Sequence, residues 1–278
     1  MNLGEALTRA KARIDARDAQ YLLADLLKVS RASIIAHSER ELTDSDANEF
    51  ERRVAARANG KPVAYIIGTR EFYGRNFFVN ENVLIPRPET ELLVEQALVR
   101  LSGHKWPESR ASAHVLDMGT GSGVIATTLA LLSRQSQISA CDISHHALEV
   151  ARQNARRLDA NVEFIQSNWY AALGGRRFDL IVANPPYVAS GDTHLTEGDL
   201  RFEPPMALTD GSIDGLDSIR AIIEGAKAHF APGGWLLFEH GFDQSTPTRT
   251  ALFNAGFESL ICIKDLAGIP RVSGGQIR

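Results

Sequence analysis

The sequence predicts an α/β protein with a doubly wound parallel sheet, preceded by a small all-helical domain and a β-hairpin connector. Beyond Ala113, short apolar runs alternate with segments of helical periodicity, the pattern of repeated β-α-β units. Roughly the first 60 residues show apolar residues at helical spacing and no strand-like alternation. These patterns place a helical domain at residues 1–67, a connector at 68–88 and the α/β domain at 89–278.

The N-terminal segment carries signals for both the start and the end of helices. Leu3, Leu7 and Ala10 recur at helical spacing. Residues 43–46, Thr-Asp-Ser-Asp, supply capping side chains and negative charge, both of which favour a helix start. The Asn-Gly pair at 59–60 is typical of a helix end.

The connector mixes aromatic and β-branched residues with prolines. We expect its hairpin to pair residues 77–79 with residues 83–85 across a polar turn at 80–82. Pro86 and Pro88 cannot continue a strand, so a helix is expected to begin near Glu89.

The α/β domain is expected to contain six strands and four intervening helices. The predicted strands are 114–118, 138–142, 162–165, 178–183, 235–239 and 259–264, and the predicted helices are 124–133, 145–158, 216–230 and 245–255. Ligands of doubly wound sheets bind beyond the carboxyl ends of the strands. Polar residues that follow those ends are therefore the candidates for chemistry.

Composition and charge narrow the classes of function. No apolar run approaches the ~18–20 residues that cross a bilayer, and no secretory signal is evident, so a cytoplasmic location without membrane attachment is expected. The chain has 30 basic and 34 acidic residues, whereas proteins that live on duplex nucleic acid usually carry a basic excess. We expect no stable nucleic-acid partner, and a monomer.

The two cysteines, Cys141 and Cys262, lie in apolar, strand-like surroundings. Two isolated thiols cannot form a metal cluster, so both are expected to be small buried hydrophobes. No metal site is predicted.

A glycine-rich turn follows the first strand of the sheet. Asp117 precedes Gly119, Gly121 and Gly123, and the next strand ends in Asp142, 19 residues after Gly123. A carboxylate at that place can accept hydrogen bonds from ribose hydroxyls. Nicotinamide dinucleotides prefer G-x-G-x-x-G, whereas the G-x-G-x-G spacing with an adjacent acid favours the cationic amino-acid end of S-adenosylmethionine. A plain turn with incidental glycines is the alternative.

Two further strand ends carry candidate residues. Asn168 can contact an adenine edge, and Trp169 serves equally well as a cover for adenine or as a core anchor. The fourth strand ends in Asn184-Pro185-Pro186-Tyr187. The Asn184 side-chain oxygen and the Pro185 carbonyl can accept both hydrogens of a planar NH₂ group, on which Tyr187 can stack.

Such a clamp suits methyl transfer to a planar nitrogen. The lone pair of an amide or exocyclic amine is delocalised, so positioning and electrostatic relief of the positive charge growing on nitrogen must supply most of the acceleration. Together with the glycine turn and Asp142, the motif indicates an S-adenosylmethionine-dependent methyltransferase.

These residues resemble the release factor glutamine methyltransferases, over essentially the whole chain. The matching motifs are GTREFYGRNF at 68–77, IPRPETE at 85–91, LDMGTGSG at 116–123, NPPY at 184–187, RFEP at 201–204 and LLFEHG at 236–241. NPPY is shared with adenine and guanine N-methyltransferases, whereas IPRPETE and RFEP are more particular to this family.

The resemblance implies a Rossmann-like S-adenosylmethionine-dependent methyltransferase fold, with residues 1–67 as a substrate-recognition domain. It implies methyl transfer to the glutamine amide nitrogen (N5) in the Gly-Gly-Gln motif of class 1 peptide chain release factors, release factors 1 and 2, with S-adenosylhomocysteine as product. The implied cofactor residues are Gly119, Thr120, Gly121, Ser122, Gly123, Asp142, Trp169 and Asn184. The implied catalytic residues are Asn184, Pro185 and Tyr187, and these with Pro186 bind the substrate.

Several other residues have an ordinary explanation beside a functional one. Arg201 and Glu203 either shape a substrate channel or form a surface ion pair, and His145, His146 and His194 are expected to be solvated. The basic residues Arg52, Arg53 and Arg57 face a partner or form a solvated helix face. The chain also ends in its own Gly-Gly-Gln, at 274–276, for which self-methylation of Gln276 competes with chance in a glycine-rich tail.

Three other functions compete with this one. A nucleic-acid base methyltransferase shares NPPY but needs a basic groove and a base-flipping pocket. A nicotinamide-linked oxidoreductase is disfavoured by the loop spacing. A non-catalytic cofactor-binding module has no need of the clamp formed by Asn184 and Tyr187.

Overall fold

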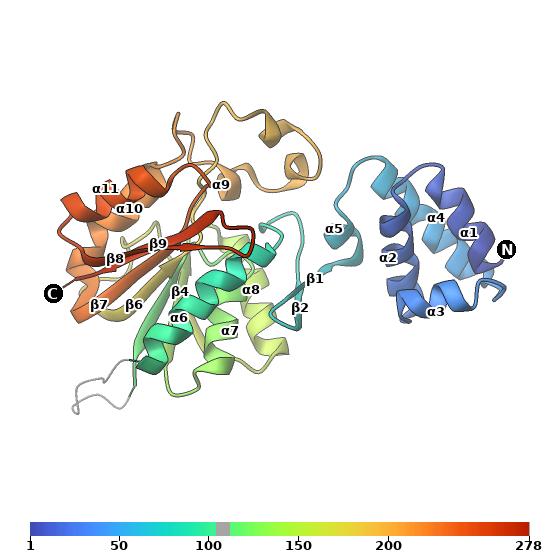
Figure 1. Ribbon diagram of the computed structural model, residues 1–278. Helices are drawn as coiled ribbons and strands as arrows, with labels where there is room; N and C mark the ends of the chain where they lie inside the picture. Colours follow the sequence, from blue (N-terminus) through green and yellow to red (C-terminus); the bar gives the residue numbers. More distant parts are fainter. Residues whose placement is uncertain (104–111, 278) are drawn as a thin grey trace. The chain divides into compact units, whose positions relative to one another are not determined.

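The structure is a computed structural model that describes residues 1–103 and 112–277 (Figure 1). The chain divides into two compact units. The first comprises Met1–Thr69 together with Thr196–Phe202, and the second comprises Arg70–Leu195 together with Glu203–Arg278. Each unit has its own hydrophobic core.

The first unit is helical. Its helices are α1 (Leu3–Lys11), α2 (Ala16–Leu27), α3 (Arg31–Ala36), α4 (Asp44–Ala58) and α5 (Val63–Ile67). Asn2 and Glu5 form a capping box on α1, and the Thr43 side chain caps α4 by accepting from the Asp46 backbone N–H. Leu22 and Leu23 of α2 are completely buried in the core of this unit.

A distant piece of chain completes this unit, which the boundary drawn at residue 67 does not include. Arg57 of α4 donates to Asp18 and to Asp199, each at 2.6 Å, so its guanidinium joins α2 to the segment Thr196–Phe202. Arg52 and Arg53 likewise bind acidic residues of the same unit, with Glu49 as their shared partner. The three arginines are therefore ion-paired within their own unit.

The hairpin of β1 (Thr69–Phe72) and β2 (Arg75–Phe78) belongs to the second unit except for its first residue, Thr69. The expected hairpin, centred on residues 80–82, was wrong in position. Tyr73 and Gly74 both adopt positive φ, 52° and 72°, which is the geometry of a two-residue turn that follows the twist of the strands. Val83 and Ile85 are buried without forming a strand, so their apolar character reflects packing.

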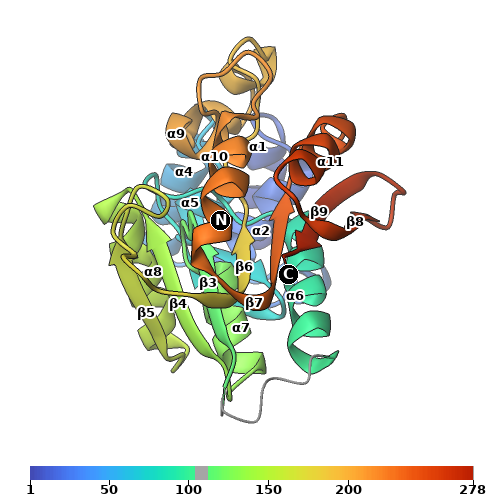
Figure 2. The same cartoon turned by 90° about the vertical axis from the view of Figure 1, so that its left-hand side faces the viewer.

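The second unit is built on a seven-stranded mixed sheet. The strands are β3 (His114–Met118), β4 (Gln137–Asp142), β5 (Val162–Gln166), β6 (Phe178–Ala183), β7 (Phe230–Glu239), β8 (Glu258–Lys264) and β9 (Pro270–Gln276). They follow one another in the order β5-β4-β3-β6-β7-β9-β8, from left to right in Figure 2. The predicted Rossmann-like α/β class is confirmed.

The expectation of a wholly parallel sheet was wrong at one edge. β9 was missed, and it runs antiparallel to both β7 and β8. Its sequence is rich in small residues, which rarely signal a strand, but Gly274 and Gly275 allow close approach of the neighbouring strands. Cys262 is exposed on the edge strand β8 and is not the buried hydrophobe that was expected, whereas Cys141 is buried.

Helices cover both faces of the sheet (Figure 1). On one face lie α6 (Glu91–Gly103), α7 (Val124–Leu132) and α8 (His145–Arg157), and on the other lie α10 (Asp217–Ala226) and α11 (Ser245–Asn254). The 3-10 helix η1 (Pro88–Thr90) precedes α6, and the short helix α9 (Pro205–Leu208) precedes α10. Across the described ranges, no helix is both long and apolar enough to cross a membrane.

The missed strand leads to a stability prediction. A Cβ at Gly274 would overlap the Leu236 carbonyl oxygen of β7, so Gly274→Ala must push β9 away from the sheet. We expect urea denaturation to show an unfolding free energy about 1–3 kcal/mol lower, the usual cost of overpacking. Gly175→Ala is the matched control, because a Cβ at Gly175 meets nothing within 4 Å. Equal stability of the two variants would contradict the close packing of β9.

Candidate active site

The order of the strands places two loops side by side. β3 pairs in parallel with both β4 and β6. The chain runs from β3 through β4 to β5 on one side of β3, and then crosses to β6 on its other side. Met118 and Ala183, the last residues of β3 and β6, are paired in register. The glycine turn that begins at Gly119 and the motif that begins at Asn184 therefore leave the same edge of the sheet, at its topological switch point.

A cavity of about 330 Å³ lies at this edge. It is lined by Asn82, Val83, Leu84, Pro86, Arg87, Thr90, Gly119, Thr120, Gly121, Ser122, Val124, Ile125, Cys141, Asp142, Ile143, Ser144, Ala147, Ser167, Asn168, Trp169, Asn184, Pro186, Pro204, Met206, Ala207, Thr209, Asp210 and Ser218. Most predicted site residues are thus brought together. Gly123, Pro185 and Tyr187 are not in its lining.

Two glycines of the turn are required for different structural reasons. Gly121 has a φ of +54°, and a Cβ built there meets nothing within 4 Å, so its bare face leaves room inside the cavity. At Gly123 a Cβ would lie only 2.9 Å from the Ala151 Cβ of α8, so this glycine permits close packing of the turn against the helix. Both positions require glycine, one for space in the cavity and one for the fold.

Asp142 links the end of β4 to the glycine turn. Its carboxylate accepts from the Gly121 backbone N–H and from the Ser144 backbone N–H, each at 2.9 Å. Burial raises the pKa of this carboxyl, and the backbone hydrogen bonds act in the opposite direction. The turn is therefore held from the neighbouring strand by a carboxylate that also lines the cavity.

Asp117 lies directly behind the turn and is completely buried. Its Oδ2 accepts from the Thr120 hydroxyl at 2.6 Å and from the Ala126 backbone N–H at 3.1 Å. Its Oδ1 has no hydrogen-bond partner among the described residues. Burial raises the pKa of this carboxyl to about 7, although the two hydrogen bonds oppose the shift.

Trp169 and Asn168 form another part of the lining, beyond β5. Trp169 adopts a φ of +45°, and its indole lies 3.7 Å from the point where Gly119 would carry a Cβ. The Ser167 hydroxyl donates to the Trp169 carbonyl at 2.7 Å and supports this unusual backbone. The indole lies beside the glycine turn and also packs against the core of the sheet.

The motif after β6 contributes two residues to the lining, Asn184 and Pro186. Pro185 is buried, and the Tyr187 hydroxyl donates to the buried Glu239 at 2.9 Å. Burial raises the pKa of the Tyr187 hydroxyl, and the nearby Glu239 carboxylate raises it further. Tyr187 is therefore a neutral hydrogen-bond donor anchored at the end of β7.

Glu203 has a structural partner that sequence analysis did not identify. It is 3% exposed, and its carboxylate accepts from the Ile85 backbone N–H at 2.8 Å and pairs with Arg87 of the cavity lining. Glu203 is thereby fixed to the segment at 85–91. Arg201 belongs to the helical unit, where it donates to the Asn59 carbonyl, so it does not pair with Glu203.

The remaining candidates do not line the cavity. His145 and His146 are exposed and contact Glu149, and His194 is exposed and contacts Asp192. Gln276 ends β9, where its side chain donates to the Gly233 carbonyl. The glycines before it are buried in the sheet, which favours chance over self-methylation as the origin of this Gly-Gly-Gln.

Several residues of the cavity lining were not predicted from the sequence. Thr90, Met206, Asp210 and Ser218 come from segments that carry no nucleotide-binding spacing. The Asp210 carboxylate accepts from the Ser218 backbone N–H at 2.7 Å, near the start of α10. For Thr90 the family motif at 85–91 was a usable signal, and for the other three no local pattern marks them.

Two family models match the chain. Residues 3–68 match the PrmC N-terminal domain, and residues 91–199 match the methyltransferase small domain.

Several curated relatives align over nearly the whole chain. Release factor glutamine methyltransferase of Neisseria gonorrhoeae is 48% identical, over 93% of this chain and 92% of that protein. The protein of the same name from Xylella fastidiosa (strain Temecula1) is 46% identical, over 97% and 96%. The one from Escherichia coli K12 is 39% identical, over 99% and 97%.

Solved structures share the fold at low identity. A methyltransferase from Pyrococcus furiosus aligns with a TM-score of 0.54 at 19% identity, covering 81% of this chain and 98% of that one. The 16S rRNA N2 G1207 methyltransferase of T. thermophilus, solved with AdoMet and guanosine, gives 0.54 at 19% identity, over 76% and 50%.

Asp117 leads to a pH-dependent prediction. Its folded-state pKa of about 7 lies above the ordinary 3.8, so the folded state binds this proton more tightly than the unfolded state does. The contribution of Asp117 to the free energy of unfolding is therefore largest at low pH and is lost as the pH rises through the folded-state pKa. The loss amounts to about 2–3 kcal/mol between pH 5 and pH 8. Asp117→Asn removes that decline, so its stability relative to the parent should rise by this amount.

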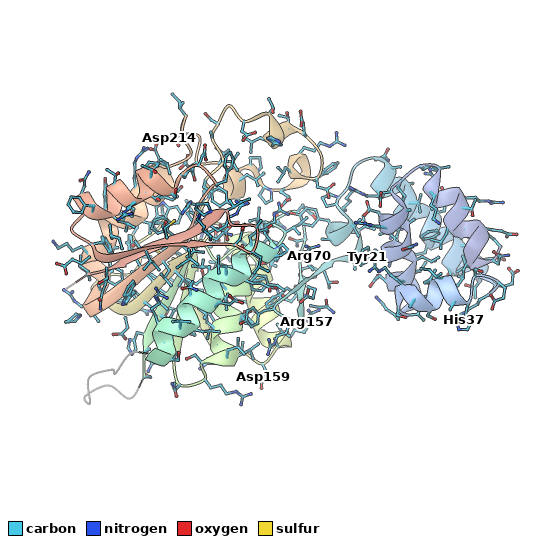
Figure 3. All side chains as sticks on the ribbon, viewed as in Figure 1. Tyr21, His37, Arg70, Arg157, Asp159 and Asp214 are labelled. Atoms are coloured by element: carbon cyan, nitrogen blue, oxygen red, sulfur yellow. The ribbon has the colours of Figure 1, made fainter. Side chains whose placement is uncertain are left out.

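The measurement is urea denaturation of both proteins across this pH range without ligand. Asp159→Asn, which removes the exposed carboxylate labelled in Figure 3, controls for the loss of charge. A difference between parent and Asp117→Asn that stays constant with pH would contradict the raised pKa.

Proposed function

The chain belongs to the family of release factor glutamine methyltransferases, and we propose that it methylates the glutamine of the Gly-Gly-Gln motif in class 1 peptide chain release factors. The methyl group goes from S-adenosylmethionine to the side-chain amide nitrogen, N5, and leaves S-adenosylhomocysteine. Release factors 1 and 2 are the protein substrates. The observation that carries this proposal is one cavity lined by both the glycine turn and Asn184.

The residues of the cavity fit the cofactor. Gly121 leaves an open face where a side chain would fill the space, and the buried Asp117 Oδ1 lacks a partner among the described residues. An unpaired carboxylate oxygen beside the turn suits a cationic amino group. We assign the amino-acid end to residues 119–123, the ribose to Asp142 and the adenine to Trp169. When bound, the cofactor supplies an electrophilic methyl group.

Asn184 and Pro185 orient the acceptor nitrogen. Oxygen acceptors from the Asn184 side chain and the Pro185 carbonyl take the two hydrogens of the glutamine NH₂, which turns the nitrogen lone pair toward the methyl group. Both oxygens also stabilise the positive charge that develops on nitrogen. Pro186 and Tyr187 complete the substrate site, with Tyr187 packing on the planar amide. The extra proton is acidic once the methyl is transferred, so no strong base is needed.

The remaining assignments concern the whole molecule. We assign recognition of the release factor to the helical domain at 1–67, joined by the connector at 68–88 to the methyltransferase domain at 89–278. We also propose that the protein is a cytoplasmic monomer that binds neither a membrane nor, stably, a nucleic acid. Support comes from the match of residues 3–68 to a separate family domain and from the acidic net charge of −4.

Peptide mass spectrometry tests the proposed activity. Purified protein, S-adenosylmethionine and a full-length release factor are expected to give one added methyl on the Gly-Gly-Gln glutamine. Asn184→Ala should slow the reaction by about 10²-fold or more, because it removes one of two orienting acceptors. Asn161→Ala, which changes an exposed asparagine outside the cavity lining, is the control. Methyl transfer to RNA or DNA offered in parallel, with none to the release factor, would contradict the substrate class.

A peptide substrate tests the role of the helical domain. Because remote contacts contribute to transition-state binding, a short Gly-Gly-Gln peptide should show kcat/KM at least about tenfold below that of the full factor. The same peptide with glutamate in place of glutamine is the negative control. A peptide as efficient as the whole factor would contradict recognition outside the motif.

A further inference from the structure

Two buried residues connect the motif at 184–187 to the rest of the unit. Thr90 ends the 3-10 helix η1 and is 2% exposed, and Glu239 ends β7 and is 1% exposed. Asn184 donates through Nδ2 to the Thr90 hydroxyl oxygen at 3.1 Å. The Thr90 hydroxyl in turn donates to Glu239 Oε2 at 2.7 Å.

The other oxygen of the same carboxylate binds the other end of the motif. Tyr187 donates its hydroxyl to Glu239 Oε1 at 2.9 Å. Both oxygens of Glu239 thus accept hydrogen bonds from hydroxyl groups. One hydroxyl is that of Thr90, which supports Asn184, and the other is that of Tyr187. Thr90 and Asn184 line the cavity, whereas Glu239 lies behind them.

Glu239 determines the polarity of this chain of hydrogen bonds. Burial raises the pKa of its carboxyl, but the hydrogen bonds from Thr90 and Tyr187 to its two oxygens oppose that shift and stabilise the ionised form. An ionised carboxylate only accepts hydrogen bonds, so the single proton of the Thr90 hydroxyl is donated to Glu239. The hydroxyl oxygen then offers only lone pairs to Asn184, which must present its NH₂ group and not its carbonyl oxygen. The Asn184 Oδ1 consequently lies on the opposite side of the amide group.

Rotation of the Asn184 amide by 180° would reverse this arrangement. The NH₂ of Asn184 would then oppose the NH₂ of the substrate, donor against donor, and the clamp would lose an acceptor. The two orientations have nearly the same shape, so packing alone cannot select between them. A hydrogen-bond partner of fixed polarity can.

We propose that Thr90 and Glu239 are positioning residues that hold the Asn184 amide with its oxygen toward the methyl-accepting nitrogen. The proposal deepens the proposed methyl transfer to glutamine and rests on it. The motifs at 85–91 and 236–241 contain no residue that we assign to the cofactor or the substrate. The proposal gives one residue of each motif, Thr90 and Glu239, a role in positioning Asn184.

Substitutions at Thr90 separate polarity from shape. Thr90→Val keeps the shape and removes the hydroxyl, whereas Thr90→Ser keeps the hydroxyl. We expect Thr90→Val to lower kcat for release factor methylation about 10- to 100-fold, with the dissociation constant for S-adenosylmethionine changed less than about threefold. Thr90→Ser should restore kcat to within about threefold of the parent.

Glu239→Gln is an independent test with almost no change of volume. Glutamine offers one acceptor and one NH₂ group, so it cannot accept from both the Thr90 and the Tyr187 hydroxyls. We expect kcat to fall at least about tenfold, while the cofactor dissociation constant and the circular dichroism spectrum are kept. Glu224→Gln, on the exposed face of α10, is the matched control.

A spectroscopic readout does not depend on the release factor. The side-chain NH₂ resonances of Asn184, identified by their loss in Asn184→Ala, should exchange slowly with solvent in the parent. In Thr90→Val and Glu239→Gln they should shift and exchange faster, because the acceptor is lost or its polarity disturbed. Thr90→Ser should leave them close to the parent positions.

The outcomes separate this proposal from the proposed function. A parent protein that does not methylate release factors contradicts the function, and the resonances of Asn184 still test the positioning. Thr90→Val with kcat and resonances like the parent overturns the positioning. So does a Thr90→Ser variant as impaired as Thr90→Val, which would show that the methyl group, not the hydroxyl, matters. If Thr90→Val does not fold, Glu239→Gln decides by the same criteria.

Discussion

Parallel pairing of β3 with β6 is the constraint on which the site depends. The register that places Met118 beside Ala183 makes the glycine turn and Asn184 leave the sheet at the same height. Both line one cavity, the turn on the side that we propose for the cofactor and Asn184 on the side that we propose for the acceptor. A shift of the β6 register by one residue would turn its side chains to the opposite face and remove Asn184 from the cavity.

Carboxylates that are buried or half-buried then hold the loops at this edge of the sheet. Asp142 holds the glycine turn through the Gly121 N–H, Glu203 binds the segment at 85–91, and Glu239 supports Asn184 through Thr90. Each is satisfied by donors from a different part of the chain. Because removing the partners of a buried charge is costly, such groups couple the geometry of the site to the fold. Asp117 differs in keeping one oxygen unpaired among the described residues, beside the proposed cofactor site.

Most of the fold followed from local sequence patterns. The strands β3 to β6 and the helices α7 and α8 lie within one or two residues of their predicted limits, because uninterrupted apolar runs and helical spacing are strong local signals. β9 was missed and the hairpin was misplaced, both for the same reason. In both, glycine and its neighbours take conformations or contacts that are set by the partner strand, not by the residue types.

The sequence determined which chemistry is present: the glycine spacing, Asp142 and the motif at 184–187 can be identified without coordinates, because each consists of characteristic residue types at the end of a predictable strand. The tertiary structure alone decided how these groups are held. No local sequence pattern predicts the hydrogen bond between Thr90 and Glu239, which are 149 residues apart in the chain. Asp199 gave no local sign that it would bind Arg57 in the helical unit, 142 residues away. Such pairings arise because folding buries polar groups that must then find partners, and sequence distance places no limit on where those partners come from.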